Sequence, residues 1–292
     1  MSENIKIGII GDDRRLRTVA ARLSRRYECA VFGLDSVPEN AVKCTSWKSA
    51  VKAADAIVLP IPVTRDGKNL NCSTDAISLH ELVSLASPGS VVFGGMIPSE
   101  IRSLIGERSA VFHDYNDSEA FQIRNSVPTA EGAIAAMIGE MPITLYGMSV
   151  TVTGYGKVAR ALCQRLVALG STVYVAARRD SALATAATEG CVPVTLSEYL
   201  DYPHDTDAII NTVPVRLFDD GVISKIDPKT IYFELAGGDG GIDGEIAQKN
   251  GIKVVRLPSL PGKTSPETAG DIMANEILSK LDRVFMSGGD ER

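Results

Sequence analysis

The chain has 292 residues, enough for two domains of ordinary size, each with its own core. Hydrophobic residues make up 45% and charged residues 23%, which is the balance of a globular protein in water. With 30 basic and 36 acidic residues the net charge is -6, which excludes a protein whose basic surface binds nucleic acid.

The first residues and the cysteines predict a cytoplasmic protein. Residues 1–4 lead directly into a strand-like run and lack the features of a signal peptide. No apolar stretch reaches the ~20 residues of a membrane span, so we expect no membrane association. The five cysteines are far apart, without a C-x-x-C pair or a histidine at metal-binding spacing. We therefore expect free thiols in a reducing compartment and no metal site.

Strand-like runs alternate with helical stretches along most of the chain. The first half has expected strands at Ile5–Ile10, Ala30–Leu34, Ala56–Leu59, Val91–Phe93 and Ala110–Phe112, with a helix at Arg14–Arg26. The second half has them at Ser149–Thr153, Thr172–Ala176, Ala208–Asn211, Thr230–Glu234 and Lys253–Leu257. This alternation predicts an α/β fold of two Rossmann-like, doubly wound domains with an interdomain cleft.

The domain boundary has signals of its own. Pro128 and Thr129 predict the start of a helix through Ile138, with Thr129 as its cap and Glu131 in its first turn. Glycine and proline then interrupt the chain before the next strand. We expect a first domain at 1–128, a connecting helix and linker at 129–146, and a second domain at 147–265. A last helix begins with Ser265 as cap and Pro266 in the first position.

The clearest motif is Gly154-Tyr155-Gly156-Lys157-Val158-Ala159, between an expected strand and an expected helix. In a dinucleotide-binding turn the first glycine allows the sharp bend, and the second lets the backbone approach a pyrophosphate. A small third residue lets the helix pack closely on the sheet. The helix N-terminus then offers N–H groups to the phosphates, so the motif predicts a nucleotide site over residues 154–159.

Two arginines and a serine follow the next strand. Arg178 lies 24 residues after Gly154, where NAD-binding proteins usually place an acidic residue on the ribose. Arg178 and Arg179 instead favour the 2′-phosphate of NADP, through charge-assisted hydrogen bonds. Ser181 adds a hydroxyl. We therefore expect NADP as the cofactor.

The ends of later strands supply further candidates, because ligands of open sheets gather there. The segment Asn211–Pro214, with Thr212 and Val213, is expected on the nicotinamide side. The backbone of Glu234–Gly238, with Leu235 and Ala236, is expected to come near the cofactor. In the first domain, residues 8–13 read G-I-I-G-D-D. They lack a second glycine at the spacing of the motif, and two aspartates would repel a pyrophosphate, so we expect one nucleotide site and not two.

Three segments together resemble the dipicolinate synthase A-subunit family of spore-forming bacteria: Asn125–Gly132, the Gly154 turn and Leu260–Gly270. The first matches the family segment N-S-[IV]-P-T-x-E-G, and the last matches L-P-G-x-x-x-P-x-T-A-G. The resemblance covers nearly the whole chain, and it favours a return of the last helix, about 266–292, to the first domain. One departure affects how the substrate is expected to bind. Where the family has S-R-P-G-G, this chain has Gly237–Gly241, so it lacks an arginine that could bind a substrate carboxylate.

The resemblance implies an activity and a setting. It implies NADP-dependent oxidation of dihydrodipicolinate to dipicolinate during sporulation, in the mother-cell cytoplasm. It also implies a partner, the flavoprotein-like B subunit of dipicolinate synthase. A homo-oligomer is left open.

A substrate with two carboxylates needs hydrogen-bond donors and positive charge. The expected helix start at Thr129, with the Ser126 hydroxyl nearby, and the helix after Lys263 and Thr264 are candidates for this role. Arg15 is a third candidate, and Glu131 is the candidate proton acceptor. The histidines, at 80, 113 and 204, lie outside the matched segments. An NADP-dependent 2-hydroxy-acid-type dehydrogenase therefore lacks an obvious base but stays an alternative, as does a non-catalytic NADP(H)-binding subunit.

Overall fold

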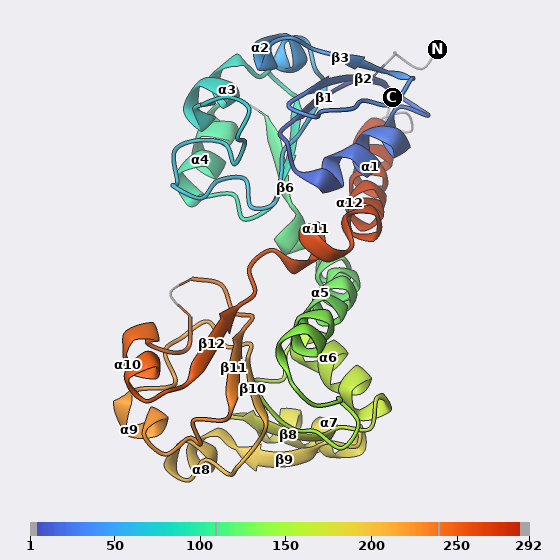
Figure 1. Ribbon diagram of the computed structural model, residues 1–292. Coiled ribbons are helices and arrows are strands. Elements are labelled where there is room, and N and C mark those ends of the chain that lie inside the picture. Colours follow the sequence, from blue (N-terminus) through green and yellow to red (C-terminus); the bar gives the residue numbers. More distant parts are fainter. Residues whose placement is uncertain (1–4, 109, 239, 287–292) are drawn as a thin grey trace. The chain divides into compact units, whose positions relative to one another are not determined.

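The computed structural model describes residues 5–108, 110–238 and 240–286 and divides the chain into two compact units. Unit 1 comprises Met1–Asn125 with Ser265–Arg292, and unit 2 comprises Ser126–Thr264. Both units are α/β structures built on a six-stranded parallel sheet (Figure 1). The expected pair of Rossmann-like domains is confirmed.

In unit 1 the strands follow the spatial order β3-β2-β1-β4-β5-β6, the order of a dinucleotide-binding fold. Their bounds are β1 Lys6–Ile10, β2 Glu28–Phe32, β3 Ala41–Lys43, β4 Ala56–Val58, β5 Val91–Gly94 and β6 Val111–Asp114. The short edge strand β3 has only three residues, two of them exposed, and so carries no apolar run by which the sequence could predict it.

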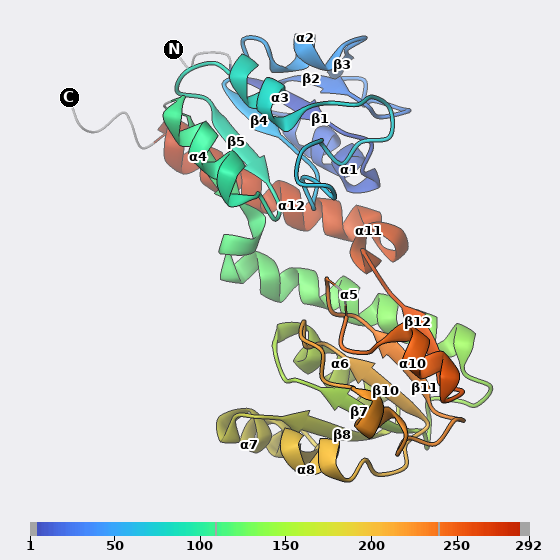
Figure 2. The same cartoon turned by 90° about the vertical axis from the view of Figure 1, so that its left-hand side faces the viewer.

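Helices cover both faces of this sheet. One face packs against α1 (Arg14–Leu23) and α12 (Pro266–Leu281), and the other against α2 (Trp47–Val51), α3 (Leu79–Leu85) and α4 (Ser99–Glu107). The predicted return of the last helix is confirmed, since α12 lies along α1 (Figure 2). Arg22 and Asp271 form an ion pair between the two helices, with an N–O distance of 2.6 Å.

Unit 2 repeats the architecture, with strand order β12-β11-β10-β7-β8-β9. The strands are β7 Ser149–Thr153, β8 Thr172–Ala177, β9 Val192–Thr195, β10 Ala208–Asn211, β11 Ile231–Glu234 and β12 Lys253–Arg256. Helices α6 (Lys157–Ala168) and α7 (Asp180–Thr188) pack on one face, together with the second half of α5. Helices α8 (Leu196–Asp201), α9 (Asp220–Ile223) and α10 (Gly244–Lys249) pack on the other face.

The predicted helix start at Thr129 is wrong. Helix α5 runs from Glu119 to Glu140 and contains Pro128 in its interior. Its N-terminus is held by Ser118, whose hydroxyl accepts a hydrogen bond from the backbone N–H of Phe121 at 3.2 Å. A proline at position 128 resembles the start of a helix in the sequence, but α5 continues through it, at the cost of one backbone hydrogen bond and crowding against the carbonyl four residues earlier. No described helix, α5 included, is long and apolar enough to cross a membrane.

Candidate cofactor site

The Gly154 turn connects β7 to α6 in unit 2. Gly154 has a φ of +84°, and a Cβ at this position would lie 2.8 Å from both the Thr212 hydroxyl and a methyl group of Val213. Only glycine fits such a position. Ala159 is fully buried against the sheet in the first turn of α6, so a small residue is required there too.

Gly156 has a different environment, and this difference points to a ligand. It is the N-cap residue of α6 with a φ of −85°, and a Cβ built on it would meet nothing within 4 Å. Neither backbone conformation nor protein packing requires glycine here. Open space beside the backbone is what the second glycine of a dinucleotide-binding turn provides for the pyrophosphate.

The N-terminus of α6 also carries no side-chain cap among the described residues. Gly156, the residue before the helix, has no side chain that could cap it, so no side-chain oxygen of the cap residue opposes the positive end of the helix dipole. In unit 1 the equivalent position of α1 is different. Asp13 caps that helix, and its carboxylate accepts the backbone N–H of Arg15 at 3.0 Å. A second carboxylate, Asp12, accepts the backbone N–H of Ser73 at 2.7 Å.

Arg178 and Arg179 are both exposed at the end of β8, where α7 begins. Neither forms an ion pair within the part of the chain that the structure describes, so both guanidinium groups are available to a phosphate. Ser181 is exposed in the first turn of the same helix. The predicted 2′-phosphate residues thus lie together at one strand end.

Tyr155 anchors the turn to α7. Its hydroxyl donates to Glu189 at 2.6 Å, and the Arg160 guanidinium donates to the other oxygen of the same carboxylate, at 2.7 Å from its Nε. The hydrogen bond from Arg160 lowers the pKa of Glu189, and burial, with the bond to Glu189, raises the pKa of Tyr155. The Tyr155 side chain is therefore engaged with protein, and at this position the backbone remains for a cofactor. Lys157 and Val158 follow, half-buried, at the start of α6.

Thr212 and Val213 follow β10, and Leu235 and Ala236 follow β11. The Thr212 hydroxyl donates to the carbonyl of Thr153 at 2.7 Å, which ties its loop to the end of β7. All four residues are half-buried at the carboxyl edge of the sheet, where the sequence predicted them to lie.

Sequence reasoning placed Asn211 and Glu234 in candidate loop segments, but it missed Thr153 and the contacts among the three side chains. Thr153, Asn211 and Glu234 are the last residues of β7, β10 and β11, and each is buried. They lie side by side because Asn211 pairs with Thr153 on one side and with Glu234 on the other in the sheet register. A polar residue at the end of each of three buried strands was the available signal.

The expected substrate residues of unit 2 lie on two helices. Ser126 is buried and Thr129 half-buried in α5, but because the helix starts at Glu119, Thr129 offers no helix N-terminus to a ligand. Glu131, more than half exposed, accepts hydrogen bonds from Arg165 at 3.3 Å. Lys263 and Thr264 lie in the short helix α11 (Leu260–Thr264) and are exposed.

The structure brings the two matched segments of unit 2 together. A Cβ on Gly132 would lie 2.8 Å from the Thr264 hydroxyl and 3.1 Å from the Cβ of Leu260, so glycine is needed where α5 meets α11. That hydroxyl donates to the Leu260 carbonyl at 2.9 Å. Helix α12 then begins after Ser265, with Pro266 in its first turn as predicted.

Arg15, in unit 1, is buried to 95% and is not the solvated arginine that its helical position suggests. Its Nε donates to Asp13 at 2.9 Å, and Nη2 donates to Asp13 and to the carbonyl of Ile61. Burial of a guanidinium requires such partners. In these contacts Arg15 holds the loop after β1.

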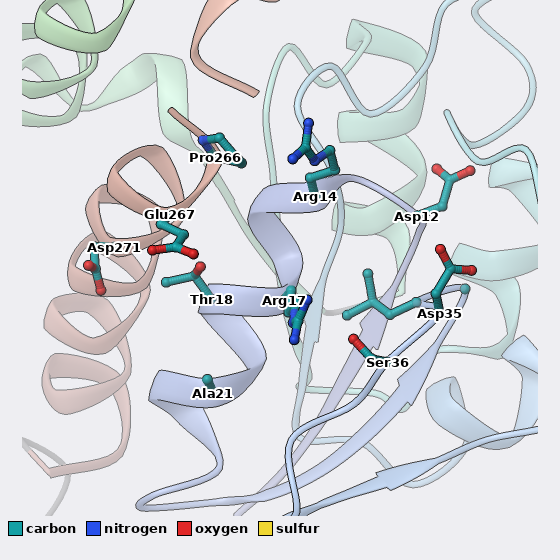
Figure 3. Close-up of a pocket in the computed structure, with 12 residues that line it drawn as sticks. Asp12, Arg14, Arg17, Thr18, Ala21, Asp35, Ser36, Pro266, Glu267 and Asp271 are labelled. Atoms are coloured by element: carbon teal, nitrogen blue, oxygen red, sulfur yellow. The ribbon is translucent and has the colours of Figure 1, made fainter. Parts of the chain in front are cut away.

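Unit 1 contains a hollow of about 490 Å³ beside its own Rossmann turn (Figure 3). Arg14 and Arg17 line it from α1, Asp35 from the loop after β2, and Glu267 from α12. Its lining is of mixed charge. With Asp12 and Asp13 at the turn, it lacks the uncapped helix N-terminus that unit 2 presents.

Comparison with known proteins identifies the family. Residues 6–116 match the family model described as the N-terminal domain of the dipicolinate synthase A subunit, and residues 149–230 match one described as NADP oxidoreductase, coenzyme F420-dependent. Over 288 residues the chain is 30% identical to the dipicolinate synthase A subunit of Bacillus subtilis (strain 168). The matched region covers 96% of this chain and 97% of the relative. The chain belongs to the dipicolinate synthase A-subunit family.

Two solved structures of the dipicolinate synthase A-subunit family agree with this membership. Those from Bacillus halodurans and Bacillus subtilis each match with a TM-score of 0.87 and 29% identity. The match covers 96% and 98% of this chain, respectively, and 99% of each of those chains. A transhydrogenase from Sinorhizobium meliloti, at a TM-score of 0.67 and 15% identity, and an L-alanine dehydrogenase, at 0.66 and 14%, share the fold.

The oxidoreductase match covers the Gly154 turn, both arginines and the loop at Thr212. Within the dipicolinate synthase A-subunit family, unit 2 is therefore an oxidoreductase-type domain for a nicotinamide cofactor. The segment Gly237–Gly241, where the family arginine is missing, follows β11; within it Asp239 lies outside the described residues.

Proposed function

We propose that this chain is the A subunit of a dipicolinate synthase and oxidises dihydrodipicolinate to dipicolinate with NADP⁺, in the mother-cell cytoplasm during sporulation. Family membership and the oxidoreductase-type domain support this proposal. The observation that carries it is the uncapped N-terminus of α6 beside the open space at Gly156.

The choice of NADP over NAD rests on Arg178 and Arg179. A 2′-phosphate carries about two negative charges and accepts several hydrogen bonds, and guanidinium groups bind such an anion in a bidentate manner. The end of β8 has no acidic residue before Asp180, which belongs to the first turn of α7. An NAD site would need such a residue to hold the ribose 2′-hydroxyl.

The reaction removes a hydride and a proton from a dihydropyridine ring, and the aromatic product supplies the driving force. A bound nicotinamide would supply the hydride acceptor. The protein must then bind, orient and electrostatically balance a dicarboxylate. We assign this binding within unit 2 to Lys263 and Thr264, with the hydroxyls of Ser126 and Thr129, and we assign the proton to Glu131. Arg15, the third candidate from the sequence, is buried against Asp13 and Ile61 in unit 1 and is left out of this assignment. In the described contacts Glu131 pairs with Arg165 at 3.3 Å, a weak surface pair that leaves its carboxylate free to act.

The partner in this proposal is the B subunit of the synthase, expected to be flavoprotein-like. The relatives are named as the A subunit of their synthase, which supports the existence of a second one. The alternatives are an NADP-dependent 2-hydroxy-acid-type dehydrogenase and a subunit that binds NADP(H) without catalysis.

A reconstitution assay separates these functions. Dihydrodipicolinate and NADP⁺ are mixed with the full chain, with and without the B subunit, and NADPH absorbance is followed. We expect NADPH to form and the Arg178→Ala variant to need more NADP⁺. Tight NADPH binding without turnover would favour the non-catalytic subunit, and turnover of a 2-hydroxy acid instead would favour the dehydrogenase.

A further inference from the structure

The buried polar side chains at the ends of β7, β10 and β11 form one continuous hydrogen-bonded chain. The Thr153 hydroxyl donates to Oδ1 of Asn211 at 2.6 Å, and Nδ2 of Asn211 donates to Oε1 of Glu234 at 2.8 Å. All three residues are at least 97% buried. Unpaired, each would carry a large desolvation cost, so the chain of bonds must be complete to be tolerated.

Asn211 uses its whole hydrogen-bonding capacity here. Besides these two bonds, Oδ1 accepts the backbone N–H of Val213 at 3.1 Å, and Nδ2 donates to the Val213 carbonyl at 2.9 Å. The amide thus closes a small ring with the loop after β10. That loop is the one that presses Thr212 and Val213 against Gly154.

Glu234 does the same for the loop after β11. Its Oε1 accepts the backbone N–H of Ala236 at 3.0 Å, and Oε2 accepts that of Gly241 at 2.6 Å and the hydroxyl of Tyr232 at 3.1 Å. Both oxygens face only donors, as suits a carboxylate, which accepts and does not donate. Burial, together with the negative charge of Glu234, raises the pKa of Tyr232.

The loop is shaped around this carboxylate. A Cβ on Gly240 would lie 2.9 Å from Oε2 of Glu234, and one on Gly241 would lie 2.3 Å from Nδ2 of Asn211. Gly240 also has a φ of +80°. Gly240 and Gly241 therefore let the backbone pass close to the buried side chains, and the Glu234 carboxylate accepts the N–H groups of both Ala236 and Gly241.

We propose that Asn211 and Glu234 are positioning residues for the nicotinamide half of the cofactor, an inference that rests on the proposed NADP(H) site of unit 2. They tie the loops after β10 and β11 to each other and to the end of β7, and those two loops carry Thr212, Val213, Leu235 and Ala236. The adenosine half depends on Arg178 and Arg179 at the end of β8, outside this chain of bonds. The network therefore acts on one half of the ligand only.

The test compares two ligands on the full-length chain by calorimetry. NADPH contains the nicotinamide, whereas adenosine 2′,5′-bisphosphate contains only the adenosine half. In Glu234→Gln an amide N–H₂ must face other donors, so the loop is displaced. We expect NADPH to bind about tenfold more weakly and the bisphosphate to change less than about twofold. Glu245→Gln, an exposed glutamate in α10 of the same unit, is the matched control and should change neither affinity.

Equal weakening of both ligands would overturn the inference, because the network would then serve only the stability of unit 2. No change in NADPH affinity would overturn it as well. If Glu234→Gln does not fold, Thr153→Val removes one donor and should show the same selectivity at about threefold. This binding measurement needs no substrate. If Glu234→Gln shows the expected selectivity but the wild-type chain does not oxidise dihydrodipicolinate, only the proposed activity is refuted.

Discussion

Gly270 lies against the backbone carbonyl of Arg15, so that a Cβ on Gly270 would be 2.6 Å from the carbonyl oxygen. The same Cβ would lie 2.7 Å from Cβ of Thr18. Helix α12, near the end of the chain, can thus lie against α1, near its start, only because residue 270 is glycine. This contact explains physically why the last helix belongs to unit 1.

Gly270→Ala should destabilise the protein by about 1–3 kcal/mol, because the extra methyl group meets backbone that cannot move aside. Gly139→Ala is the matched control: Gly139 lies in α5, and a Cβ there meets nothing within 4 Å. That variant should gain up to about 1 kcal/mol in helix propensity. Thermal unfolding of both variants measures the difference, and equal midpoints would contradict the close packing.

Arg178→Ala should weaken NADPH binding about 10- to 100-fold and leave NADH binding nearly unchanged, because charge-assisted hydrogen bonds to the 2′-phosphate are lost. Arg216→Ala controls for charge, since Arg216 is exposed in the same unit and pairs with Asp243. Fluorescence titration with both nucleotides measures the ratio. An equal loss for NADH would show that Arg178 does not bind the 2′-phosphate.

Glu131→Gln should lower kcat by about 100-fold or more if its carboxylate takes the proton. Glu140→Gln is the control on the same helix, because Glu140 is also exposed and ion-paired, with Lys253 at 2.7 Å. Steady-state rates of both variants at several pH values show whether the Glu131 carboxylate takes the proton or has no part in the reaction. A Glu131→Gln variant as active as Glu140→Gln would remove Glu131 from the reaction.

Stability should fall as the pH falls below about 6.5, in part because of His204. Burial between Tyr174 and Tyr199 lowers the pKa of His204, and the charge of Asp205 only partly opposes this. The unfolded chain therefore binds a proton at a higher pH than the folded chain, so the loss appears on acidification and is absent above the ordinary histidine value. His113 is shifted in the same direction by burial.

His204→Gln should therefore show a smaller drop in thermal midpoint than wild type between about pH 7 and about pH 5. His80→Gln, exposed on α3, should behave as wild type. An unchanged drop in the His204 variant would assign the pH dependence to other groups.

The sequence predicts most of both sheets because their central strands are short buried runs rich in β-branched and apolar residues. Strands β7 and β10 have the bounds expected from their buried runs, whereas β3 and β9 were missed. Each of those two lies at one edge of its sheet, and β9 (Val192–Thr195) has no buried residue. A short edge strand with little burial gives only a weak pattern, although the edge strands β6 and β12 were predicted.

The site features that the sequence predicts are local in the chain, whereas those that it missed depend on residues far apart. The Gly154 turn is a local motif and is where the sequence placed it. The helix start at Thr129 was wrong, because a proline at a first helical position and one inside a helix look alike without knowledge of Ser118. The bonds among Thr153, Asn211 and Glu234 join residues up to 81 positions apart, so only the sheet register reveals them.

A crystal structure of the full chain with NADP⁺ tests the central claim most directly. The account predicts the diphosphate on the backbone of Gly154–Gly156 at the start of α6, with the 2′-phosphate against Arg178 and Arg179. A nucleotide bound elsewhere, or an occupied turn with the 2′-phosphate turned away from both arginines, would contradict it.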